Sequence, residues 1–460
     1  MPTNHRPNHV SWKRGKSFAI ATLAILATTA VAWAAAGGLD LTFGSGGVVQ
    51  TDGAGKAMGL SSAIVQPDGR IVACGYHSNA GGGSEWWVRR YNADGTDDSS
   101  FGNGGLLALY GAGSDYAARA AVDSYGRIVV VGHVDLIQSS RRTYTHTYYS
   151  TLVRLNPNGS LNTSFGSGGV VSIVVPGALA SATSPRPQSA DERVILQADG
   201  RIVVSGLAYF AIDKKGTTRI YPFLARYNAD GSPDSSFGSG GFSVDRRATE
   251  DTGIVRGLAR QSTGCFVMSQ QRASVETVIT RYLPGGSVDT GFSPILLASD
   301  VLFGISVDRF DRIVGAGRLY PGNPFSILVR RFTADGGTDT SFASGGSTLI
   351  HVPGYDSALA HADPVFQADD RIVLGATLVP LSSGTTYLAT TVRLLDNGLL
   401  DGTYGTGGIG DVIDLGPDTA HTGWDETADR TVLLAPDGSV ILAGNRDQVW
   451  YWMIARFNAN

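Results

Sequence analysis

The sequence predicts an all-β protein, a single closed seven-bladed β-propeller whose blades are four-stranded antiparallel sheets. Three observations support this fold. A unit of about 60 residues recurs along the chain. Each unit holds short β-branched and aromatic runs that are bounded by Gly, Asn and Asp. The two ends of the repeat region each carry half a unit, which is what a closed ring needs.

The repeat is clearest at a Phe-Gly signal, of which "SSFGSGG" at Ser235–Gly241 is one copy. Seven copies or weaker variants place an aromatic residue at the same point of each unit. These residues are Phe43, Phe101, Phe165, Phe237, Phe292, Phe342 and Tyr404. Two other signals keep the same spacing. One resembles "QPDGRIVACG" at Gln66, and the other is an arginine followed by an aromatic residue or Leu. The arginines are Arg90, Arg154, Arg226, Arg281, Arg331, Arg393 and Arg456.

Each unit reads as four strands in order. In the first unit they are "GLSSAIVQ", "RIVACGYH", "EWWVRRY" and "GLLALYG". The first two are joined by a Pro-Asp-Gly turn, in which Pro fixes φ and Gly takes the positive φ. The chain ends halfway through a unit, at "WMIARFNAN", and the repeat region opens with the missing half, "LDLTFGSGGVVQTD". We therefore expect the N-terminal strand to complete the last blade and cover its edge.

These units resemble the delta-60 repeat of bacterial secreted proteins, whose pattern is close to "QPDGKIVVAG…RYNADGSLDTSFGxGG". The resemblance covers nearly all of the chain after residue 36. It implies a β-propeller fold and export. It carries no assigned catalytic residues and implies little about activity.

The N-terminal 36 residues form a separate segment. A basic head with Arg6, Lys13, Arg14 and Lys16 precedes an apolar run, Phe18–Ala34, that ends in small residues. This order is typical of a secretory signal peptide, and the alternative is a retained N-terminal anchor. We expect residues 37–460 to form the propeller, with no later membrane span and a secreted location, periplasmic or extracellular.

Charge and cysteine content narrow the function classes. Removing the four basic residues of the signal would take the formal net charge from −4 to −8, which argues against a general nucleic-acid binder. Cys74 and Cys265 are too few for a disulfide framework, and we expect two buried thiols. No pair with metal-ligand spacing occurs among His77, His133, His146, His351, His361 and His421, and "GTGGIG" at Gly405 belongs to the repeat. We expect no metal and no cofactor.

The stretch "RYNADGSPDSSFGSGG", Arg226–Gly241, resembles a metal or phosphate loop. Comparison of its copies indicates a structural turn instead. The carboxylate in "NADG" varies between units, whereas the following Gly persists. The arginine is present in every unit, and an aspartate precedes the aromatic in all units except one, which has Asn162. We predict an Arg–Asp latch between the third and fourth strands, for example Arg90–Asp98, Arg226–Asp234 and Arg331–Asp339. The alternative is a ring of anion-binding arginines.

Strand alternation divides the predicted ring into two faces. The turns after the first and third strands share one face, here called the constant face. The loops after the second and fourth strands share the other, here called the variable face, which carries nearly all length variation. Three insertions in blades 2 and 3 lie there, at 133–150, 174–192 and 207–222. The candidate binding residues in the first and third are Arg141, Arg142, Tyr144, His146, Tyr148, Tyr149, Lys214, Lys215, Arg219 and Tyr221. The alternative is a pair of long solvated hairpins.

A second candidate site is the mouth of the central channel. The innermost strand of each blade starts on the variable face, and its early positions are polar and of mixed charge. They include Arg119, Asp191, Arg193, Arg256, His361, Asp363, Asp429 and Arg430. Such a funnel suits a small ligand or a catalytic site, and it is also what a water-filled channel looks like.

The sequence therefore favours a rigid, monomeric binding scaffold that recognises a surface polysaccharide, an envelope component or a protein through its variable face. The alternative is a hydrolase or lyase with its active site in the central funnel. No catalytic residue is indicated by a motif.

Overall fold

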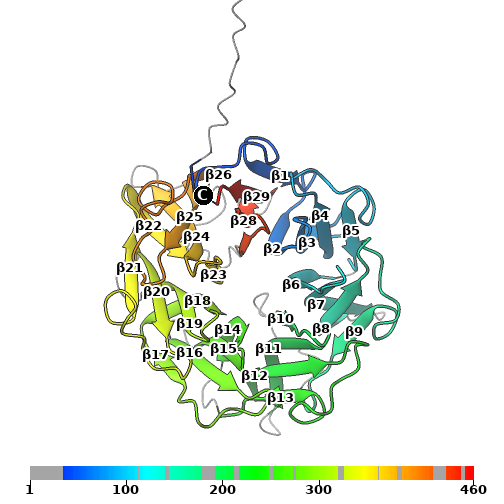
Figure 1. The fold of residues 1–460 in the computed structure, drawn as a ribbon. Helices are drawn as coiled ribbons and strands as arrows, with labels where there is room; N and C mark the ends of the chain where they lie inside the picture. Colours follow the sequence, from blue (N-terminus) through cyan, green and yellow to red (C-terminus); the bar gives the residue numbers. More distant parts are fainter. Residues whose placement is uncertain are drawn as a thin grey trace, which may run out of the picture. The chain divides into compact units, whose positions relative to one another are not determined.

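The computed structural model contains a ring of seven β-sheets around a central axis (Figure 1). It describes residues 35–111, 113–139, 144–178, 192–211, 217–247, 252–272, 276–319, 326–360, 362–380, 386–417, 431–446 and 451–459. The segment Ala34–Asn460 forms one compact unit. Within the described ranges every regular element is a strand, so none of them contains a helix that could span a membrane.

The first three blades are formed in chain order. Blade 1 contains β2 (Met58–Val65), β3 (Ile71–Ser78), β4 (Ser84–Tyr91) and β5 (Leu106–Leu109). Blade 2 contains β6 (Tyr116–Val122), β7 (Ile128–Ser139), β8 (Tyr144–Leu155) and β9 (Val170–Ile173). Blade 3 contains β10 (Arg193–Leu196), β11 (Ile202–Ala211), β12 (Thr218–Tyr227) and β13 (Phe242–Val244).

The next three blades repeat the arrangement. Blade 4 contains β14 (Thr252–Arg260), β15 (Phe266–Arg272), β16 (Glu276–Tyr282) and β17 (Ile295–Leu297). Blade 5 contains β18 (Asp300–Val307), β19 (Ile313–Leu319), β20 (Ser326–Phe332) and β21 (Ser347–His351). Blade 6 contains β22 (Tyr355–Ala360), β23 (Val365–Phe366), β24 (Ile372–Pro380), β25 (Thr386–Leu394) and β26 (Ile413–Pro417).

Blade 6 has its inner strand in two pieces, which the sequence analysis did not anticipate. Both β22 and β23 pair with β24, on either side of a break that contains Pro364. Proline has no backbone N–H and cannot donate to the ladder at that point. The blade keeps the four-stranded path of the others.

The seventh blade confirms the predicted closure. It contains β27 (Thr431–Leu434), β28 (Val440–Arg446), β29 (Tyr451–Phe457) and, as its outer strand, β1 (Val48–Asp52). β1 pairs antiparallel with β29 from Val48 opposite Ala455 to Asp52 opposite Tyr451. The N-terminal strand therefore covers the edge that β29 would otherwise leave unpaired.

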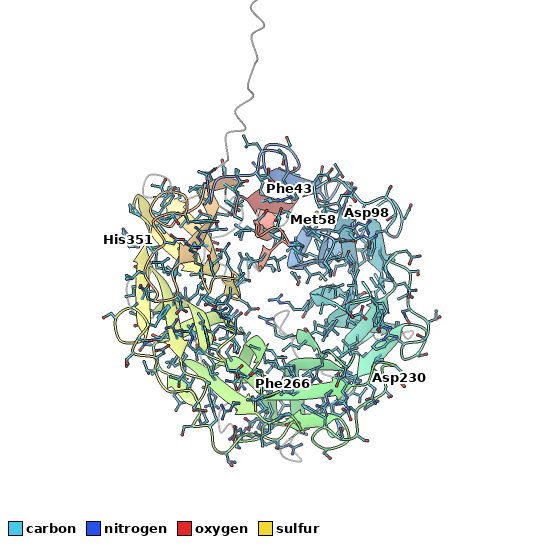
Figure 2. All side chains as sticks on the ribbon, viewed as in Figure 1. Phe43, Met58, Asp98, Asp230, Phe266 and His351 are labelled. Atoms are coloured by element: carbon cyan, nitrogen blue, oxygen red, sulfur yellow. The ribbon has the colours of Figure 1, made fainter. Side chains whose placement is uncertain are left out.

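The core lies between neighbouring blades. Seven clusters of buried residues each combine side chains from two or more sheets, and Trp86 and Trp452 have no exposed surface. Cys74 and Cys265 are buried free thiols, as expected. Viewed down the axis, Asp230 and His351 lie near the outer rim of the ring and Phe266 lies closer to its centre (Figure 2).

The Arg–Asp pairs predicted from the sequence are present on the constant face. Arg90 Nε lies 2.7 Å from Asp98 Oδ2, and the same distance separates the pairs Arg226–Asp234 and Arg331–Asp339. Equivalent pairs occur at Arg281–Asp289, Arg393–Asp401 and Arg456–Asp40. In blade 2, Arg154 Nη2 donates to Asn162 Oδ1 at 3.2 Å, and its buried Nε has no hydrogen-bond partner.

The arginines also join each blade to the next, which the sequence analysis missed. Arg226 of blade 3 donates from Nη1 to the carbonyl of Pro284 in blade 4 at 2.8 Å. Its guanidinium lies over the Phe237 ring, with 4.6 Å from Cζ to the ring centroid. The six other arginines donate to the corresponding turn of the following blade, at Pro157, Ala229, Ala334, Asp396, Ala459 and Ala93. The predicted latch between strands is therefore also a joint between blades.

The glycine that recurs in this turn from unit to unit completes the joint. Gly231 of blade 3 has φ +88°, and a Cβ there would lie 2.9 Å from Cε2 of Phe165 in blade 2. Because left-handed φ and the close ring both exclude a side chain, the position requires glycine. This explains why the glycine persists while the preceding carboxylate varies. A metal site would have needed the opposite pattern.

Gly231→Ala tests the joint against a matched control. Gly82 has nearly the same φ, +85°, but nothing lies within 4 Å of its would-be Cβ. We expect left-handed strain of about 1–2 kcal/mol in both alanine variants. Crowding against Phe165 should add about 2 kcal/mol for Gly231→Ala alone. Equal unfolding free energies for the two variants in urea titrations would contradict the close contact as a determinant of stability.

Arg226→Ala should lower the free energy of unfolding at neutral pH by about 2–3 kcal/mol, because it removes the closer of the two arginines at the buried Asp234 carboxylate and leaves only the partly exposed Arg201, at 3.4 Å. Asn162→Asp is the reciprocal change. It gives Arg154 the carboxylate that the other blades have, and we expect a gain of about 1 kcal/mol. Chemical denaturation measures both. Unchanged stability of Arg226→Ala would refute the latch.

Candidate functional site

The candidate binding residues are predicted on the variable face, and the structure describes only part of them. Arg141, Arg142, Lys214 and Lys215 lie outside the described residues, as do Asp191, His361, Asp429 and Arg430. Their predicted roles therefore remain predictions.

Among the described strands, the two of the blade 2 hairpin are the longest. β7 and β8 each have 12 residues, against eight in β3 and β4 of blade 1. The pairing continues to Ser139 opposite Tyr144, the last pair before the connecting loop. At about 3.3 Å per residue, four extra residues extend each strand by roughly 13 Å. The hairpin therefore continues well past the variable-face end of blade 1.

The candidate residues of β8 follow in register. Tyr144, His146 and Tyr148 occupy alternate positions opposite Ser139, Ile137 and Asp135. Tyr149 lies between them and the ring, opposite Val134, and is half-buried. The strand thus brings the predicted tyrosines and histidine onto one continuous hairpin.

In blade 3 the structure separates the two described candidates. Arg219 is half-buried near the hairpin end. Tyr221 is only 7% exposed and packs against Phe210, with 5.7 Å between ring centroids. Tyr221 belongs to the hydrophobic core of this blade and offers little surface to a ligand. Its aromatic character reflects packing, which an isolated Tyr in a sequence does not reveal.

Arg246 is a surface residue that the sequence analysis did not select. It lies in the link between blades 3 and 4, is exposed, and holds its Cζ 4.4 Å from the centroid of the Phe210 ring. Only the fold brings this link beside the blade 3 hairpin. The pair Arg246–Arg247 in the acidic context of "VDRRATED" was the available signal.

The described channel-mouth residues are held in contacts between blades. The inner strand has a register irregularity on the variable side in blades 1, 2, 4 and 5, for example between Leu60 and Ser62. Such bulges free a backbone carbonyl from the ladder. Arg119 of blade 2 donates to the Ser61 carbonyl of blade 1 at 2.6 Å, and Arg193 of blade 3 donates to the Arg256 carbonyl of blade 4 at 2.6 Å.

Two further mouth residues also contact protein groups, Arg256 within its own blade and Asp363 in the neighbouring blade. Arg256 donates to Gln271 Oε1 from Nε at 3.0 Å and from Nη2 at 2.7 Å. Asp363 of blade 6 accepts from the Ile305 N–H of blade 5 at 3.0 Å. Four of the eight predicted mouth residues are described, and all four contact protein groups. These contacts give the mouth charges a structural role at the inner rim.

Glu192 is a buried carboxyl group at the same rim. It is 5% exposed, its Oε1 accepts from Ser150 Oγ at 2.8 Å, and its Oε2 has no hydrogen-bond partner. Burial raises the pKa of Glu192, and the Ser150 hydroxyl and the nearby Arg193 and Arg119 oppose that shift. The group is shielded from a ligand in the channel.

His133, at the base of the blade 2 hairpin, is also buried. It is 4% exposed, and its ring stacks on Tyr116 at 5.5 Å between centroids. Burial disfavours the imidazolium and lowers the pKa of His133 to about 4, against a smaller opposite effect of Asp135. The described residues contain no cluster of three or more His, Cys, Asp or Glu side chains that could hold a metal ion.

Sequence comparison supports a β-propeller repeat family. Residues 66–101, 126–165 and 197–237 match the model of a family described as "Domain of unknown function (DUF5122) beta-propeller". Each match ends at the aromatic of the Phe-Gly signal, so it covers the latch described above. No curated protein matches the chain in sequence.

Solved structures are similar in fold only. A protein of unknown function from Dyadobacter fermentans DSM 18053 aligns with 76% of this chain and 99% of its own, at 12% identity and a TM-score of 0.46. Drosophila Semaphorin 2a aligns with 90% of this chain and 75% of its own, at 9% identity and a TM-score of 0.46. PQQ-bound aldose sugar dehydrogenase from Streptomyces coelicolor aligns with 71% of this chain and 92% of its own, at 13% identity and a TM-score of 0.37.

The low pKa of His133 predicts a pH dependence of stability. Between about pH 6.5 and 4 the unfolded chain binds a proton at this histidine that the folded protein does not, so stability falls as pH falls through this range. The loss amounts to about 3 kcal/mol. His133→Phe keeps a ring beside Tyr116 and removes the titration. Its unfolding free energy should fall less steeply than the wild type's over that range, and parallel pH profiles would contradict the assignment.

Proposed function

We propose that this protein is a β-propeller scaffold that binds a partner through its variable face. The observation that carries the proposal is the contrast between the two faces. On the constant face, the repeated Arg, Asp, aromatic and Gly residues are engaged in joints between blades. On the variable face, neighbouring blades 2 and 3 extend their hairpins to 12 and 10 residues per strand.

Rigidity supports a binding role. A hairpin of two isolated strands is marginally stable in water, but these hairpins continue strands that are already held in a four-stranded blade. Such pre-organisation lowers the entropy lost when a partner binds. The partner we propose is a surface polysaccharide, an envelope component or a protein. In this proposal the scaffold is exported and acts as a monomer.

The contacts at the channel mouth favour binding over catalysis. Arg119, Arg193 and Asp363 each contact the backbone of a neighbouring blade, and Glu192 is buried beside Ser150. A general acid or base must reach the reacting group within hydrogen-bond distance. These groups instead form hydrogen bonds within the propeller.

The experiment is a co-sedimentation assay with isolated cell envelopes and the full chain. In the test variant, residues 135–148 of the blade 2 hairpin are replaced by the short blade 1 segment 78–84. We expect this variant to lose at least about tenfold in affinity, since hot-spot residues dominate interfaces. Tyr125→Asp is the matched control. Tyr125 is exposed in a constant-face turn of the same blade, and blade 1 has Asp68 at the equivalent position.

The outcomes separate the candidate functions. Binding that is lost with the hairpin and kept in Tyr125→Asp supports the proposal. Wild-type protein that does not bind envelopes at all, or a hairpin variant that binds as well as the wild type, contradicts it. Release of soluble fragments from the envelopes by wild-type protein would favour a hydrolase or lyase instead.

A further inference from the structure

A cationic surface lies on the blade 3 side of the variable face. It consists of Arg219 on β12, which pairs with Phe210 in the ladder, and Arg246 in the link that follows β13, which lies over the Phe210 ring. Phe210 and Arg219 are directly opposite each other in the β11–β12 ladder, so their side chains share one face of the sheet. Arg246 comes from outside the hairpin and covers the Phe210 ring at 4.4 Å.

The position of these arginines is set by buried aromatic residues. Phe210 is 4% exposed and Tyr221 is 7% exposed, and their rings contact each other. Arg246 Cζ also lies 6.0 Å from the Tyr221 centroid. The aromatic pair therefore forms a rigid floor, and a guanidinium that stacks on it loses less freedom on binding an anion than a fully solvated one would.

The neighbouring Arg247 differs from Arg219 and Arg246 because it has a carboxylate partner. Arg247 donates to both oxygens of Asp245, each at 2.9 Å. Burial would raise the pKa of Asp245, but the hydrogen bonds and charge of Arg247 lower it overall. Arg247 is thus neutralised within the fold. Among the described residues no carboxylate forms an ion pair with Arg219 or Arg246.

We propose, on the basis of the binding function above, that Arg219 and Arg246 recognise carboxylate groups of an acidic polysaccharide. The planar guanidinium fork matches a carboxylate in a bidentate arrangement. The aromatic side chains at this surface are buried beneath the arginines, whereas protein interfaces generally place aromatic residues at their centre. A hydrated chain with repeated carboxylates fits a polar, cationic surface better than a protein partner does.

The experiment measures binding of the full chain to polygalacturonate, a carboxylated polysaccharide, with uncharged dextran as the comparison. We expect binding to polygalacturonate alone, weakening with added salt because the contacts are exposed. Arg219→Gln and Arg246→Gln should each weaken it by about tenfold, the effect of losing one charge-assisted contact. Arg246→Lys keeps the charge without the planar fork, and we expect an intermediate affinity.

Arg260→Gln is the matched control. Arg260 is an exposed arginine at the constant-face end of β14, and the substitution removes the same charge from the opposite face. Thermal melting checks that all variants remain folded. Polygalacturonate binding that is lost in the two test variants and retained in Arg260→Gln supports the assignment.

Three results would overturn it: no binding of polygalacturonate by the wild type, equal binding of dextran, or equal losses in Arg260→Gln and the test variants. Envelope binding distinguishes this inference from the proposed function. If the Arg219→Gln/Arg246→Gln double variant still binds envelopes as well as the wild type, the polysaccharide assignment fails while the scaffold function stands. If wild-type protein binds no envelope, the scaffold function itself fails.

Discussion

A buried guanidinium shared between two blades is the interaction on which the ring depends. Arg226 shows how it works: its Nε pairs with Asp234 in its own blade, and its Nη1 reaches the Pro284 carbonyl of the next. A buried charge is tolerated only when it is paired and its remaining donors find acceptors. Neither blade alone satisfies this arginine. The same requirement recurs around the ring, and the last joint is that of Arg456 in blade 7, which donates to the Ala93 carbonyl of blade 1.

This constraint explains the distribution of sequence over the two faces. The joint needs an arginine, an aromatic ring and a glycine without Cβ at fixed places, so the constant face changes little from blade to blade. The loops of the variable face take no part in the joint. They can lengthen, as in β7–β8 and β11–β12, without disturbing the contacts that hold the ring together. Blade 2 combines the longest of the described hairpin strands with the one joint in which Asn162 replaces the aspartate.

The inner rim uses a second set of contacts. Bulges in the first strands expose carbonyls such as those of Ser61 and Arg256, and arginines of adjacent blades donate to them. The four described charges of the channel mouth thus each have a structural contact within the propeller. On the outer part of the variable face, Arg219 lies opposite Phe210 in the ladder and Arg246 lies over the Phe210 ring.

The sequence by itself determined the number of blades, their four strands, the closing role of Val48–Asp52 and the pairing of Arg90 with Asp98, because each is set by a periodic pattern or by residues eight apart. It did not determine which residues meet across blades. The contact of Gly231 with Phe165, the burial of Tyr221 and the placement of Arg246 over Phe210 were decided only by the tertiary structure. The physical reason is that a repeat reports what every blade shares, whereas a surface built from a hairpin and a link depends on how two segments pack in space.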